Sequence, residues 1–148
     1  MIKKILIALA IVLVLIQFIR PAKNDAGGVV YSMPTGYNVP PEVNVILKPA
    51  CLDCHSNVTH YPWYSNIQPA AWFLANHVKE GKEHLNFSEF TNRRIAYQHH
   101  KFEEIVEMVK EKEMPLPSYT WFGLHPDAKL TDAERETLII WAQSQMAM

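Results

Sequence analysis

The feature that most constrains this chain is a short motif, Cys-Leu-Asp-Cys-His, at residues 51–55. Cys51 and Cys54 are the only cysteines among 148 residues, and His55 follows the second one directly. Two cysteines are too few for a disulfide-rich scaffold, in which cross-links replace a large hydrophobic core. The chain therefore needs an ordinary core, and the cysteine pair needs a separate chemical explanation.

This spacing is typical of covalent haem attachment. Two thiols separated by two residues can add to the two vinyl groups at one edge of a haem, and the adjacent imidazole can then bind the iron. We therefore predict one haem c per chain, attached at Cys51 and Cys54, with His55 as the proximal iron ligand.

Three other interpretations of the motif are weaker but stay open. A structural zinc site needs four ligands, and the sequence contains no second cysteine pair, although His60 lies nearby. A thioredoxin-like dithiol requires a βαβ context, which the hydrophobic pattern does not indicate. A disulfide between Cys51 and Cys54 would close a loop too small to constrain much of the chain.

The haem iron has a second axial position, for which Met114 is the first candidate. Its soft thioether can bind iron, and the prolines that follow it stiffen its loop. Met114 lies 59 residues after His55, which leaves room for helices to surround the haem. His99 is the alternative sixth ligand, and an empty sixth position is a third possibility.

The first 22 residues predict a membrane segment. Lys3 and Lys4 precede an uninterrupted apolar run over residues 5–16, a pattern typical of an export signal or an N-terminal anchor. We predict an uncleaved single-pass transmembrane helix in the bacterial inner membrane, with the rest of the chain in the periplasm. Cleavage of a signal peptide is the alternative, which would leave a soluble periplasmic protein, and its weak cleavage match is at residues 26–28.

The remainder of the chain is mildly acidic. Without Lys3, Lys4 and Arg20, 11 of the 14 basic residues remain against 15 acidic residues. Nucleic-acid binding depends on basic surfaces that neutralise phosphates, so we expect no nucleic-acid partner.

We divide the chain into three parts: an anchor at residues 1–22, a flexible tether at residues 23–40 and a haem-binding domain at residues 41–148. Apolar spacing near 3.6 predicts helices, and no segment alternates as a β-strand would, so the predicted fold is all-α. The predicted helices cover residues 42–48, residues 69–80 with Gly81 at the end, residues 91–112, and a final segment that begins with a Thr131–Glu134 capping box.

Several segments carry a family resemblance: residues 51–57, 61–65, 84–88 and 113–119, together with Trp141 near the C-terminus. They resemble the small haem-binding domain proteins of Gram-negative bacteria, which are related to class I cytochromes c. The resemblance implies a cytochrome c-like helical domain wrapped around one covalent haem at Cys51 and Cys54. It also implies His55 as the proximal ligand and Met114 as the distal ligand.

Together these features predict a membrane-anchored periplasmic monohaem cytochrome that exchanges single electrons with transient redox partner proteins and is not an enzyme. A haem-based sensor or small-gas-binding module, with an open or labile sixth position, is the alternative function. A peroxidase-like enzyme is a further alternative, for which Arg93 or Arg94, with His99 or His100, would supply the acid–base groups.

Overall fold

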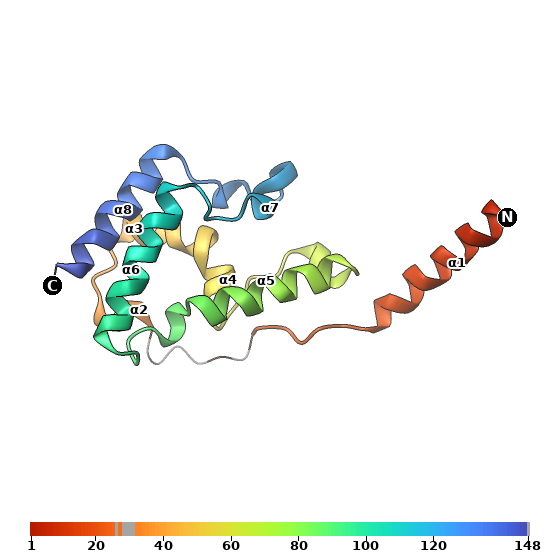
Figure 1. Ribbon diagram of the computed structural model, residues 1–148, viewed down its shortest axis with the longest axis horizontal. Coiled ribbons are helices and arrows are strands. Elements are labelled where there is room, and N and C mark those ends of the chain that lie inside the picture. The colour runs from red at the N-terminus through yellow and green to blue at the C-terminus, as the bar shows by residue number, and fades with distance from the viewer. Residues whose placement is uncertain (26, 28–31, 148) are drawn as a thin grey trace.

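The computed structural model describes residues 1–25, 27 and 32–147, and this part of the chain is all-helical without a β-strand, as the sequence predicts. Figure 1 shows a folded body from which one helix, α1, projects. The body contains three longer helices, α5 (Ala70–His84), α6 (Ile95–Lys110) and α8 (Asp132–Met146). Its shorter helices are α2 (Met33–Gly36), α3 (Pro41–Leu47), α4 (Asp53–His55) and α7 (Pro117–Thr120).

The hydrophobic core lies where α6 packs along α8 and α3 joins them. Phe102 is completely buried at its centre, and the ring centroids of Tyr37, Phe90 and Trp141 lie 5.0, 5.3 and 5.7 Å from the Phe102 centroid. These edge-to-face contacts add to the burial of apolar area that stabilises the fold. Cys51 packs against the edge of this core, which therefore supports one side of the motif.

The final helix begins as predicted. The Thr131 hydroxyl accepts a hydrogen bond from the Glu134 N–H (3.2 Å), and Glu134 Oε2 accepts one from the Thr131 N–H (2.8 Å). This reciprocal capping box bonds backbone groups that the first helical turn leaves without partners. Helix α5 differs from the prediction, because it continues through Gly81 and ends at His84.

The N-terminal segment also differs from the predicted transmembrane helix over residues 1–22. Helix α1 (Ile2–Leu15) has 14 residues, all of them exposed, and a 3₁₀ turn at Ile16–Phe18 follows it. The helical segment ends there because Ile19 has an extended backbone conformation. Among the residues that the structure describes, no helix combines the length and the apolar character needed to cross a membrane.

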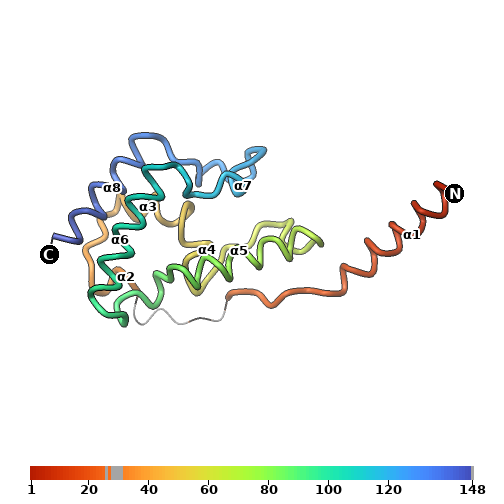
Figure 2. Tube along the Cα trace, in the orientation of Figure 1, coloured from red at the N-terminus to blue at the C-terminus, as the bar shows by residue number. Residues whose placement is uncertain are grey.

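The predicted tether, residues 23–40, makes contacts with the body. Asn24 forms hydrogen bonds to the body through both its backbone and its side chain. Met33, in α2, is only 1% exposed and belongs to the core. Residues 19–25 run along α5 (Figure 2), so the chain that leads into the tether, and the first residues of the tether, lie against the body. The cleavage match at residues 26–28 falls on residues outside the described part, apart from Gly27.

Candidate haem site

The cysteine motif begins in a wide turn. Lys48–Leu52 form a π-helical turn that contains Cys51, and α4 continues with Cys54 and His55. Such turns are frequent at functional sites, where they interrupt the regular register of a helix. Both cysteines are half-buried free thiols. Burial raises the pKa of the Cys51 thiol to about 12 and that of the Cys54 thiol to about 11, so both are uncharged at neutral pH.

A backbone carbonyl orients the ring of His55. Its Nδ1 lies 3.0 Å from the Leu85 carbonyl oxygen, which can only accept a hydrogen bond, so Nδ1 carries the proton. Nε2 is then the unprotonated nitrogen that can bind a metal. Burial lowers the pKa of His55, although the bond to Leu85 acts in the opposite direction. His55 therefore has the tautomer and the charge of an iron ligand.

Gly81 allows α5 to approach the motif closely. A Cβ atom at position 81 would lie 2.7 Å from the Cys54 carbonyl oxygen, which is closer than real Cβ contacts. The glycine is therefore required by packing, and the prediction that it ends the helix was wrong. A glycine within an otherwise helical pattern was the available signal for such a close approach.

Asp53, between the two cysteines, joins three segments. Its carbonyl oxygen accepts a hydrogen bond from Thr59 Oγ1 (2.6 Å), and Oδ1 accepts one from the His60 N–H (2.9 Å). Oδ2 accepts a hydrogen bond from the hydroxyl of Tyr119 (2.7 Å), which lies 66 residues away in α7. This bond connects the segment that follows Met114 to the cysteine motif.

A second aromatic side chain supports Tyr119. The His125 ring stacks on Tyr119, with ring centroids 3.9 Å apart and planes inclined by 13°. The Nε2 atom of His125 also lies 2.5 Å from the hydroxyl oxygen of Tyr64. Burial lowers the pKa of His125 and so favours its neutral ring. Sequence reasoning noted Tyr64 only as part of the resembling segment 61–65 and missed His125, because neither residue has a diagnostic spacing from the motif.

Met114 is half-buried in the loop between α6 and α7, and both of its backbone polar groups are bonded. Its N–H donates to the Met108 carbonyl (3.2 Å), and its carbonyl accepts a hydrogen bond from Arg135 Nη1 (2.9 Å). Arg135 also donates to the Val109 carbonyl (3.0 Å), so α8 holds the end of α6 and the Met114 backbone together. His99, the alternative sixth ligand, is half-buried within α6.

The donor set of the motif fits haem. Two uncharged thiols lie in successive turns beside a histidine whose Nε2 can bind iron. The cysteines are not joined as a disulfide, so both are available for thioether bonds. In the part of the chain that the structure describes, no group of three or more His, Cys, Asp or Glu side chains is placed to hold a metal ion.

The comparison with known families agrees with this chemistry. The family model of the haem-binding domain matches residues 11–144, a range that includes the cysteine motif and the Met114 loop. The chain therefore belongs to the haem-binding domain family, and its cofactor is haem. No curated protein and no solved structure matches the chain.

Proposed function

We propose that this protein is a membrane-attached, periplasmic monohaem c-type cytochrome that transfers single electrons. Its haem is attached covalently to Cys51 and Cys54, with His55 as the proximal ligand and Met114 as the distal ligand. The observation that carries the proposal is the 2.7 Å hydrogen bond from Tyr119 to the Asp53 side chain, because it ties the Met114 loop to the attachment motif. Membership of the haem-binding domain family supports the cofactor.

The proximal side is held by backbone and ring contacts. The Leu85 carbonyl accepts the Nδ1 proton of His55, which fixes the ring orientation and makes Nε2 a better electron donor. The Phe87 ring lies edge-on to the His55 ring, with centroids 6.3 Å apart. Helix α5 also packs closely against the Cys54 backbone at Gly81 and so supports the turn that carries His55. These contacts limit how far the proximal ligand can rotate.

The loop that contains Met114, between α6 and α7, is held at both ends. At its start, Arg135 binds the Met114 carbonyl at 2.9 Å, and at its end Tyr119 binds Asp53. The prolines at positions 115 and 117 further reduce the freedom of the backbone between these contacts. A flexible thioether on such a restrained loop needs little additional ordering to bind iron.

Two protein ligands favour electron transfer over chemistry at the iron. When bound, the haem supplies a one-electron redox couple whose potential depends on its axial ligands. If His55 and Met114 both bound the iron, no protein-free ligand position would remain for a gas molecule or a peroxide. Electron exchange then requires only a small, transient interface with redox partner proteins.

The N-terminal segment supports attachment to a membrane. Helix α1 exposes apolar side chains on all sides, a pattern typical of helices that are surrounded by apolar material. Lys3 and Lys4 precede the apolar run, an arrangement typical of an export signal or an N-terminal anchor, which supports a periplasmic haem domain. Haem c is attached on that side of the membrane, so the segment and the motif support each other.

Optical spectra of the purified protein, oxidised and reduced, with and without carbon monoxide, test the ligation. We expect a weak far-red charge-transfer band in the oxidised protein and no binding of carbon monoxide. Met114→Ala should lose the band and bind carbon monoxide, whereas Met108→Ala, a matched change in α6, should behave as the wild type does. Ready binding of carbon monoxide by the wild type would contradict His/Met ligation and favour a gas-binding sensor.

Extraction with acidified acetone tests the attachment separately. The haem should stay on the wild-type chain and be extracted from a Cys51→Ala/Cys54→Ala variant. Extraction of haem from the wild type would overturn the covalent attachment, while haem binding as such would stand.

A further inference from the structure

A small pocket lies between the segment that follows α1 and the start of α5, and Gln68 is among its lining residues. Its lining includes Arg20, Lys23, Tyr61 and Ser65, and the described residues around it include no Asp or Glu. Its volume is about 50 Å³. Because roughly 10–15 Å³ of such volume accommodates one water molecule, the pocket has room for a group with several oxygen atoms.

Ser65 is the unexplained group in this pocket. Its residue is only 9% exposed, and its Oγ has no hydrogen-bond partner within the described part of the chain. Buried hydroxyl groups are nearly always hydrogen-bonded, so an unpartnered one points to a ligand or a water. A serine hydroxyl can donate to an anion, and two cations share its pocket.

The segment that carries the two cations is fixed at both ends. On one side, the Ile19 carbonyl accepts hydrogen bonds from Gln68 Nε2 (2.8 Å) and Trp72 Nε1 (2.9 Å). On the other side, Asn24 Oδ1 accepts one from Lys82 Nζ (2.6 Å). Arg20 and Lys23 therefore lie on a segment bound along α5, close to the unpartnered hydroxyl.

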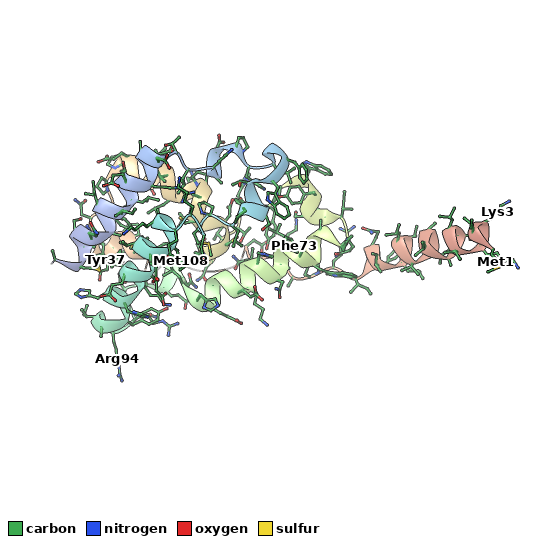
Figure 3. All side chains as sticks on the ribbon, turned by 45° about the horizontal axis from the view of Figure 1, so that its top comes forward. Met1, Lys3, Tyr37, Phe73, Arg94 and Met108 are labelled. Atoms are coloured by element: carbon green, nitrogen blue, oxygen red, sulfur yellow. The ribbon has the colours of Figure 1, made fainter. Side chains whose placement is uncertain are left out.

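The pocket is also close to α1 and to exposed aromatic side chains. Arg20 is five positions after Leu15, the end of α1, so the two residues lie at most about 18 Å apart along the chain. Trp63 and Phe73 are 73% and 58% exposed, and Figure 3 shows Phe73 at the end of the body that faces α1. Aromatic side chains of this kind are enriched at the level of lipid headgroups.

We propose that this pocket binds the phosphate of a phospholipid headgroup, with Arg20 and Lys23 as its cations and the Ser65 hydroxyl as a donor. Charge-assisted hydrogen bonds of this type are the strong ones, and phosphate offers several acceptor oxygens. Occupation of the pocket orients the haem domain on the membrane. The inference rests on the proposed attachment of α1 to lipid and is independent of haem ligation.

Native mass spectrometry of the full-length haem protein in detergent, with added phosphatidylglycerol or inorganic phosphate, tests the site. We expect the wild type to retain one phosphatidylglycerol per chain and no inorganic phosphate. Arg20→Gln/Lys23→Gln should reduce lipid retention about tenfold, as expected for the loss of charge-assisted bonds. Ser65→Ala should reduce it by a smaller factor. Lys79→Gln/Lys129→Gln, which changes the net charge equally, should retain lipid as the wild type does.

Two results would overturn the inference. Equal lipid retention by the two double variants would show that lipid does not bind in this pocket. Retention of inorganic phosphate in place of lipid would show that the pocket binds free phosphate. Flotation with vesicles of phosphatidylcholine and phosphatidylglycerol tests the attachment separately. A wild type that floats but shows no pocket-dependent retention would contradict only the pocket, whereas a wild type that does not float would contradict the attachment on which it rests.

Discussion

The two halves of the body are stabilised in different ways. In the core half, formed by α3, α6 and α8, large side chains such as Phe102 and Leu138 are completely buried. In the site half, formed by the motif, α7 and their neighbouring turns, Trp63 is 73% exposed and segments are joined by bonds such as that of Tyr119 to Asp53. Burial is shared among many contacts, whereas a hydrogen bond depends on one pair of atoms. Substitutions should therefore reduce stability in the core half and alter ligand geometry in the site half.

The largest effect on stability should come from Phe102→Ala. Loss of this buried ring should lower the free energy of unfolding by about 3–5 kcal/mol, because it removes apolar contacts and leaves a cavity. Denaturant titration followed by circular dichroism measures the change. Ile140→Ala, on the exposed side of α8, should stay within about 0.5 kcal/mol of the wild type. Similar losses in the two variants would contradict the central place of Phe102.

Gly81→Ala tests the contact between α5 and the motif. Helix propensity alone would make this change stabilising by up to about 1 kcal/mol. We expect it instead to destabilise by about 1–3 kcal/mol, because the new Cβ meets the Cys54 carbonyl. Thermal unfolding compared with Lys79→Ala, an exposed change on the same helix, measures the difference. A stabilised Gly81→Ala would show that α5 does not pack closely on the motif.

Tyr119→Phe tests the link that distinguishes the site half. Loss of the hydrogen bond to Asp53 should cost about 1 kcal/mol of stability. We expect a larger relative effect on iron ligation by Met114 than on stability. It should appear as a weaker far-red charge-transfer band and partial binding of carbon monoxide. Tyr97→Phe removes a longer bond to the His84 carbonyl (3.3 Å) and should leave the spectrum unchanged. An unchanged spectrum in Tyr119→Phe would show that the position of Met114 does not depend on this hydrogen bond.

The smallest effect should be the pH dependence that Glu134 gives to the core half. Hydrogen bonds from Thr131 lower the pKa of Glu134 below its ordinary value of 4.5 in the folded chain. Its contribution to stability is therefore present above pH 4.5 and is lost as the pH falls through the lower folded value. Because the group is exposed, we expect less than about 1 kcal/mol. The free energy of unfolding, measured as a function of pH, should lack this acid-dependent loss in Glu134→Gln and keep it in Glu136→Gln. Identical pH profiles of the two variants would rule out the Glu134 carboxylate as the source of the loss.

Local patterns predicted much of the fold and part of the candidate site. Period 3.6 predicted the principal helices, and the residues of the capping box predicted where α8 begins, because both depend on neighbours within one or two turns. The pattern was less informative at the N-terminus, where hydrophobicity alone predicted a longer helix than Ile2–Leu15. Helix length there depends on the backbone conformation at Ile19 and on its hydrogen bonds to the body.

The sequence by itself determined the chemistry of the motif. Two thiols and an imidazole within five residues predict haem attachment from their spacing alone. The chain connects these residues so closely that they stay together in any fold. Only the tertiary structure decided what surrounds them: the Leu85 carbonyl that selects the His55 tautomer, the space at Gly81 and the bond from Tyr119 to Asp53. These partners lie 27 to 66 positions from the motif residues that they contact, and a local sequence pattern cannot predict contacts that form only when helices pack.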